Sequence, residues 1–156
     1  MSADYRLQPH VNLADQVADV RAAIAWVRAH AADYGAEPGT LFVTGSSAGA
    51  NLAIRAVCEG ETGIAGLICR YGYYGDLAPH GDMPPMLVVH GEKDLSFSPP
   101  DVRAFVKRVR TVSSRPVIYA ELPGAHHDFD LYESIRSAAV SKAVEQFTER
   151  VSIFPT

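Results

Sequence analysis

Cysteines, lysines and long apolar runs are scarce in this sequence, and each shortage excludes a class of protein. Cys58 and Cys69 are the only cysteines among 156 residues. They form no Cys-x-x-Cys pair and have apolar neighbours, so we expect buried, reduced thiols rather than a disulfide. No stretch approaches the 18 or so apolar residues that a membrane-spanning helix needs, and the first ten residues lack the apolar run of a signal peptide. These absences predict a cytoplasmic protein without an integral membrane segment.

Basic blocks are missing as well. The chain has 11 arginines and three lysines, scattered along its length, and a formal net charge of −4. Such a chain has no basic stripe for nucleic acid and no polybasic patch for anionic lipid. What is present, 47% apolar and 21% charged residues, is the balance of an ordinary globular protein. We expect residues 1–156 to fold as a single domain, because this length suits one sizeable core.

Helical and strand-like patterns alternate along the chain. Apolar residues recur at steps of three and four over residues 13–34, which predicts a helix that ends at Gly35. We expect further helices over residues 48–58, 101–109 and 134–151, and short strands over residues 41–44, 64–69, 86–89 and 116–122. This alternation predicts an α/β fold, with a mostly parallel sheet of about four to five strands in a three-layer α/β/α arrangement. Functional residues gather at the carboxyl ends of such strands.

The turn Gly45-Ser46-Ser47-Ala48-Gly49 follows one predicted strand and precedes a predicted helix. That context is typical of a nucleophile elbow, in which a strained turn of small residues lifts the central serine above the sheet edge. Ser47 is therefore the candidate nucleophile, and the N–H of Ala48 at the helix N-terminus is a candidate oxyanion donor. Ser46 does not hold the central position. The structural alternative is a plain strand-to-helix turn with a serine N-cap.

A serine hydroxyl needs a base to take its proton and an acid to orient that base. Two later segments supply both groups, each after a predicted strand: His90-Gly91-Glu92-Lys93-Asp94 and Gly124-Ala125-His126-His127-Asp128-Phe129. Their order is the one that accompanies a nucleophile elbow, namely nucleophile, acid and histidine. Asp94 is the preferred acid, with Glu92 as the alternative. The residues alone leave the choice between His126 and His127 open.

Aromatic residues gather in the loop after the second predicted strand. We expect Tyr71, Tyr73 and Tyr74 to lie near the mouth of the site and to form a wall for the acyl or alcohol part of a substrate. The alternative is that they merely cover the end of the sheet with their hydroxyls in water. Arg70 is either an anion-binding group or an ordinary surface arginine.

Several segments together resemble one known family. They are Asp4-Tyr5-Arg6-Leu7, Ala25-Trp26-Val27-Arg28, Val43 to Gly49, His90 to Asp94 and Leu122 to Asp130. In these segments the chain resembles the α/β-hydrolase fold-3 group of bacterial esterases, relatives of hormone-sensitive lipase. That family has its catalytic histidine two residues before a phenylalanine, which implies His127 rather than His126. The resemblance also implies hydrolysis of small, short-acyl carboxylic esters without a metal or other cofactor.

The chain departs from that family in two regions. It begins about where the family's fourth strand ends, so the resemblance implies a truncated α/β-hydrolase that lacks the early strands and the His-Gly-Gly-Gly oxyanion loop. The loop from Gly72 to Pro85 is also shorter than its family counterpart, which implies a reduced cap. Without an early strand beside it, the strand over residues 41–44 is expected to be an exposed edge that pairs with another chain in a homodimer or higher assembly.

Two functions from different classes follow. The first is a serine carboxylesterase in which Ser47 attacks, His127 transfers the proton and Asp94 orients the imidazole. The second is a catalytically impaired remnant, or a fragment of a longer product, that serves as a binding or assembly module. The complete triad favours the enzyme. The missing oxyanion loop favours the remnant, because removing one oxyanion donor typically lowers turnover about a hundredfold to a thousandfold.

Overall fold

The computed structural model describes residues 1–153, with the backbone alone at Pro38. The α-helices are α1 (Leu13–His30), α2 (Ala48–Cys58), α3 (Pro99–Val112) and α4 (Ile135–Ile153), and two 3-10 turns are η1 (Ala31–Tyr34) and η2 (Pro38–Thr40). The strands are β1 (Phe42–Ser46), β2 (Gly66–Arg70), β3 (Met86–Gly91) and β4 (Val117–Leu122). Every helix and strand predicted from the sequence is present, with ends that differ by a few residues.

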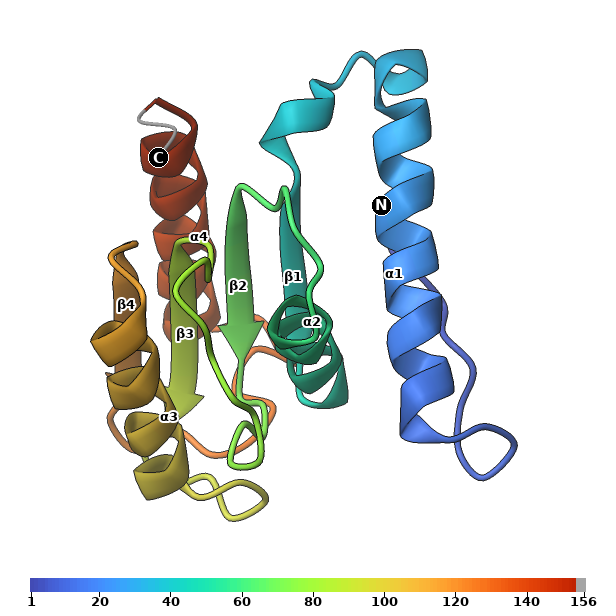
Figure 1. The fold of residues 1–156 in the computed structure, drawn as a ribbon. Helices are drawn as coiled ribbons and strands as arrows, with labels where there is room; N and C mark the ends of the chain where they lie inside the picture. The colour runs from blue at the N-terminus through green and yellow to red at the C-terminus, as the bar shows by residue number, and fades with distance from the viewer. Residues whose placement is uncertain (154–156) are drawn as a thin grey trace.

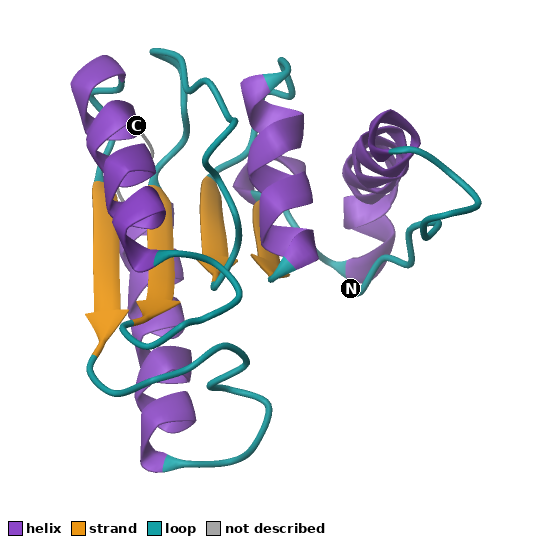
Figure 2. Cartoon of the chain, turned by 90° about the horizontal axis from the view of Figure 1, so that it is seen from below, coloured by secondary structure: helices purple, strands orange, loops and turns teal. Residues whose placement is uncertain are grey.

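The strands form one parallel sheet in the order β1-β2-β3-β4 within residues 1–153. Helices α2 and α3 cover one face of this sheet and α4 covers the other (Figures 1 and 2). The predicted three-layer α/β/α arrangement is therefore confirmed. Because all strands run in the same direction, the segments that follow their carboxyl ends meet at one edge of the sheet.

The core lies on both faces of the two central strands. Successive side chains of a strand point to opposite faces. Leu67 and Val88 pack with α2 and α3 in one apolar cluster, whereas Ile68 and Leu87 pack against Phe147 of α4 in a second. Strand β3 is buried along its whole length. Burial on both faces explains why β2 and β3 have nearly continuous apolar sequences rather than alternating ones.

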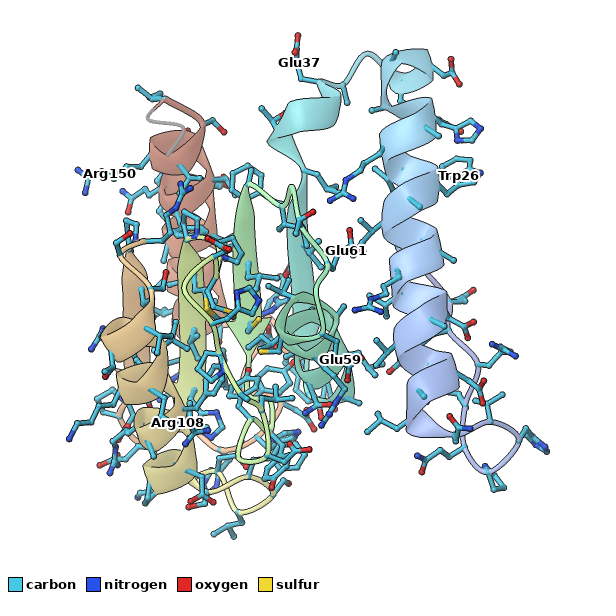
Figure 3. All side chains as sticks on the ribbon, viewed as in Figure 1. Trp26, Glu37, Glu59, Glu61, Arg108 and Arg150 are labelled. Atoms are coloured by element: carbon cyan, nitrogen blue, oxygen red, sulfur yellow. The ribbon has the colours of Figure 1, made fainter. Side chains whose placement is uncertain are left out.

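The connection from β2 to β3 carries no helix. Residues 71–85 form an irregular loop that crosses the face covered by α2 and α3. Arg108 of α3, labelled in Figure 3, donates hydrogen bonds to the backbone carbonyls of Tyr74, Gly75 and Leu77 at 3.3–3.4 Å. These bonds hold the loop against α3 and so set the position of the tyrosines that it carries.

Helix α1 lies beyond α2 at one end of the molecule (Figure 2). Asn12 and Asp15 form a capping box at its start, each side chain accepting the backbone N–H of the other residue. A small cluster around Val17 packs α1 on α2. Arg28 pairs with Glu61 at 2.7 Å, and Glu61 is labelled between the two helices in Figure 3. Helix α1 also borders a groove beside β1.

Both cysteines are free. Cys69 is buried and Cys58 is partly buried. Burial raises the pKa of each thiol, that of Cys58 to about 11, which keeps both in the unreactive thiol form. Among residues 1–153 no helix is both long and apolar enough to cross a bilayer.

Candidate active site

Ser47 occupies a strained turn between β1 and α2. Its φ of 51° and ψ of −119° lie in a region that residues other than glycine rarely adopt. A Cβ atom added at Gly45 would lie 2.4 Å from the carbonyl carbon and oxygen of Gly49, so the turn closes tightly enough to require glycine at position 45. The backbone N–H of Ser47 donates to the carbonyl of Arg70 at 2.9 Å, which ties the turn to β2. The sequence therefore predicted this strained geometry correctly.

The structure brings Ser47, His127 and Asp94 together from the ends of β1, β4 and β3. The Ser47 hydroxyl donates to Nε2 of His127 at 3.1 Å, and Nδ1–H of His127 donates to Oδ2 of Asp94 at 2.8 Å. With Nδ1–H bound to Asp94, the lone pair of Nε2 points at the serine hydroxyl. Such a relay can take the proton of the serine as its oxygen attacks an electrophile.

The Asp94 carboxylate is fully buried. Burial alone raises its pKa, but hydrogen bonds from the N–H of Phe97, the His127 ring and the N–H of Ser96 outweigh that effect, so the pKa of Asp94 lies below the ordinary 3.8. Both backbone amides donate to Oδ1, at 3.0 and 2.8 Å. Asp94 is therefore ionised at neutral pH and stabilises the imidazolium that forms when His127 takes a proton.

The structure also separates the alternatives that the sequence left open. The Glu92 carboxylate accepts the backbone N–H of Gly124 at 2.7 Å and so supports the turn before the histidines. The His126 side chain is exposed, whereas His127 is half-buried between Ser47 and Asp94. Geometry thus selects Asp94 over Glu92 and His127 over His126.

Ala48 is the first residue of α2. The first N–H groups of a helix have no carbonyl partner within the helix, and they carry the positive end of its dipole. The Ala48 amide follows the Ser47 hydroxyl directly, which is the position of an oxyanion donor in a nucleophile elbow. The sequence-based choice of Ala48 fits this placement.

The three tyrosines of the loop after β2 have different environments. The Tyr71 ring stands edge-on to His127, with 4.9 Å between ring centroids, and Tyr73 is 39% exposed beside Phe97. Tyr74 is only 1% exposed and packs on Phe105 in the core. Tyr74 therefore does not line the site, contrary to expectation, because its ring fills the space beneath the loop. Its hydroxyl also accepts the backbone N–H of Gly72 at 3.1 Å.

Arg70 and Tyr71 both bind Asp130. The Tyr71 hydroxyl donates to Oδ1 at 2.6 Å, and the Arg70 guanidinium pairs with Oδ2 at 2.7 Å. Burial and the bond to Asp130 raise the pKa of Tyr71, so this hydroxyl stays protonated and acts as a donor. Arg70 is thus neither a free anion-binding group nor an isolated surface arginine.

Sequence reasoning missed Phe97, Asp130 and His90. The Phe97 ring lies 5.4 Å from the His127 ring, and the fully buried His90 donates from Nε2 to the Phe97 carbonyl at 3.0 Å. A sequence signal was available for two of them: Phe97 lies three residues after the acid, and Asp130 lies three residues after the base. Nothing in the local pattern marks the role of His90, since its partner is a carbonyl seven residues away.

Comparison with known proteins finds ester hydrolases among the relatives. The BD-FAE family model matches residues 1–71. Two Mycobacterium tuberculosis proteins match over nearly the whole chain. The probable carboxylic ester hydrolase LipM is 31% identical, over 97% of this chain and 46% of its own length. The esterase LipQ is 32% identical, over 94% of this chain and 46% of its own length. The chain thus spans about half the length of the curated relatives it matches.

Solved structures give the same fold. Esterase 2 from Thermogutta terrifontis, phosphonylated by cyclosarin, superposes with a TM-score of 0.80 at 22% identity, covering 98% of this chain and 71% of that one. Its propionate-bound form superposes with a TM-score of 0.77 at 23% identity, covering 97% of this chain and 70% of that one. The match to LipM extends over 200 residues, so that relative carries additional residues between the segments it shares with this 156-residue chain.

Proposed function

We propose that this chain is an α/β-hydrolase and that it hydrolyses carboxylic esters through a covalent intermediate on Ser47. One observation carries the proposal: the uninterrupted hydrogen-bonded relay from Ser47 through His127 to the buried Asp94. The mycobacterial relatives are named as ester hydrolases, which supports the same reaction class.

In the proposed reaction the Ser47 oxygen bonds to the ester carbonyl carbon while its proton moves to Nε2 of His127. Asp94 stabilises the resulting imidazolium, and the Ala48 N–H donates to the carbonyl oxygen as that oxygen becomes negative. The bond to the alcohol then breaks, and the leaving oxygen takes the proton from His127. Next, His127 removes a proton from water, the hydroxide attacks the acyl carbon, and the Ser47 oxygen regains its proton as the acid departs.

We propose that the preferred substrates are esters with short acyl chains. The esterase from Thermogutta terrifontis has been solved with propionate and with butyrate bound. A site built on a short loop after β2 suits such small groups, since little chain is available to cover a long one.

A fluorophosphonate probe together with p-nitrophenyl butyrate tests the proposal. We expect labelling and turnover in the parent protein, loss of both in Ser47→Ala, and retention of both in the neighbouring control Ser46→Ala. Labelling without turnover would indicate the impaired remnant instead. If the parent protein shows neither labelling nor turnover, a working nucleophile is excluded. Unchanged activity in Ser47→Ala would show that the nucleophile lies elsewhere.

We also propose that residues 1–156 act as one hydrolase-like domain that pairs with a second copy through β1. This strand is an edge of the sheet. The Leu41 carbonyl and the Ser47 N–H both bond to β2, so even-numbered positions such as Thr44 direct their backbone groups to the open side. Unpaired groups of this kind favour pairing with a strand of another chain.

A further inference from the structure

A groove of about 690 Å³ lies beside the triad, along the loop between β3 and α3. Its apolar lining comes from Tyr73, Leu95 and Phe97, and Asp101 is the acidic residue on its open side. Leu95 is 93% exposed and Tyr73 is 39% exposed. Exposed apolar side chains next to a polar site are typical of a ligand-binding surface.

Phe97 connects the groove to the imidazole of His127. The Phe97 ring stands edge-on to that imidazole with 5.4 Å between centroids, and Tyr73 lies 5.9 Å beyond Phe97. During ester cleavage Nε2 of His127 must reach the oxygen of the departing alcohol. The group attached to that oxygen therefore lies closer to Phe97 than any other part of the substrate.

The groove is also held in shape before any ligand arrives. The amides of Ser96 and Phe97 donate to Asp94, and the Phe97 carbonyl accepts a hydrogen bond from the fully buried His90. A side chain on a loop tied at several points loses little conformational freedom on binding. The exposed carboxylate of Asp101 disfavours an anionic ligand.

We propose that the groove of Tyr73, Leu95 and Phe97 binds the alcohol portion of the ester, and that the enzyme prefers uncharged alkyl or aromatic alcohols. This inference rests on the proposed function, because it assumes that Ser47 and His127 cleave an ester. The acyl group then lies on the other side of Ser47, away from Phe97, so the identity of the alcohol is selected independently of the acyl chain.

Two ester series test the proposal. One keeps the acetyl group and varies the alcohol, from methyl to butyl to benzyl acetate; the other keeps the methyl alcohol and lengthens the acyl chain. In Phe97→Ala and Leu95→Ala we expect the ratio of kcat/KM for benzyl acetate to that for methyl acetate to fall about tenfold, as a lost apolar contact would cause. The ratios of the acyl series should stay within about twofold. Ile135→Ala is the matched control, because Ile135 is 92% exposed but lies at the start of α4.

A fall confined to the acyl series would overturn the proposal, and so would unchanged ratios in both series. A second measurement does not depend on turnover: benzyl alcohol is titrated into Ser47→Ala protein and followed by amide NMR shifts. We expect saturable shifts at residues 95–98 that weaken in the double variant with Phe97→Ala. If these shifts are absent, the groove assignment is wrong. If they are present but the parent protein hydrolyses no ester, only the proposed function is contradicted.

Discussion

Tyr71 and Asp130, which are 59 positions apart in the sequence, meet through a 2.6 Å hydrogen bond beside His127. Tyr71 follows β2 directly with a φ of 40°, and its ring contacts the rings of His127 and Phe129 edge-on. The bond therefore fastens the histidine loop, which follows β4, to the end of β2. We infer that this pair positions the imidazole without touching the reacting atoms.

Removing either partner should loosen the histidine loop. We expect Tyr71→Phe and Asp130→Ala each to lower kcat/KM about three- to tenfold and to reduce the free energy of unfolding by about 1 kcal/mol, measured in urea. Because both substitutions remove the same interaction, the double variant should lose much less than the sum of the two single losses. Fully additive losses would contradict a shared positioning role. Lys142→Met, which breaks an exposed ion pair on α4, is the control.

Substitution of the two carboxylates near β3 should separate their roles. We expect Asp94→Asn to lower kcat by about three to four orders of magnitude, since the amide neither carries charge nor holds the imidazole in the required tautomer. Glu92→Gln should change kcat by less than about threefold, because the amide oxygen can still accept the Gly124 N–H. Single-turnover kinetics with p-nitrophenyl butyrate measures both. A larger effect at Glu92 would reverse the assignment.

Gly45 and Gly49 flank Ser47, but they tolerate a side chain differently. At Gly45 a Cβ atom would lie 2.4 Å from backbone atoms of Gly49, whereas at Gly49 it would meet nothing within 4 Å. We expect Gly45→Ala to destabilise the protein by about 2–3 kcal/mol and to lower activity about a hundredfold through displacement of Ser47. Gly49→Ala should leave both nearly unchanged. Thermal unfolding and esterase assays compare the two, and equal behaviour would refute the packing argument.

Stability at acidic pH should depend on Glu121. Hydrogen bonds from Arg103 and Tyr119 lower the pKa of Glu121 from 4.5 to about 2. A carboxyl whose pKa is lower in the folded state stabilises the protein above its unfolded pKa, and this stabilisation is lost as pH falls toward the folded value. We therefore expect the urea midpoint of the parent to fall more steeply than that of Glu121→Gln between about pH 5 and pH 2. Glu145→Gln, at an exposed ion pair, should follow the parent, and parallel curves for the parent and Glu121→Gln would contradict the prediction.

Association through β1 can be tested at Thr44. Its backbone N–H faces the open side of the sheet, so Thr44→Pro removes a donor for a second chain without breaking a bond to β2. We expect a dimer of the parent at micromolar concentration in sedimentation velocity, a shift toward monomer in Thr44→Pro, and a dimer in the control Thr44→Val. A monodisperse monomer of the parent would remove the basis for edge pairing.

Much of the architecture follows from local sequence. The three- and four-residue steps of apolar positions predicted α1, α3 and α4, and the short apolar runs predicted β1 to β4, because helices and strands are specified by periodicities that span only a few residues. The strained conformation of Ser47 was predictable for the same reason: a serine among small residues, between a strand and a helix, has few other conformations available.

Tertiary structure decided what depends on contacts between distant segments. Residue types near a strand end admitted both Glu92 and Asp94, and adjacent histidines alternate in direction, so only the packed loops show which side chains meet. Tyr74 belongs to the core and Tyr73 to the surface because Arg108 and Phe105, both on α3, fix how the loop lies. The pairing of Tyr71 with Asp130 and the placement of Phe97 on His127 arise only when the loops that follow different strands meet at one edge of the sheet. Their physical cause is burial against partners that no local pattern contains.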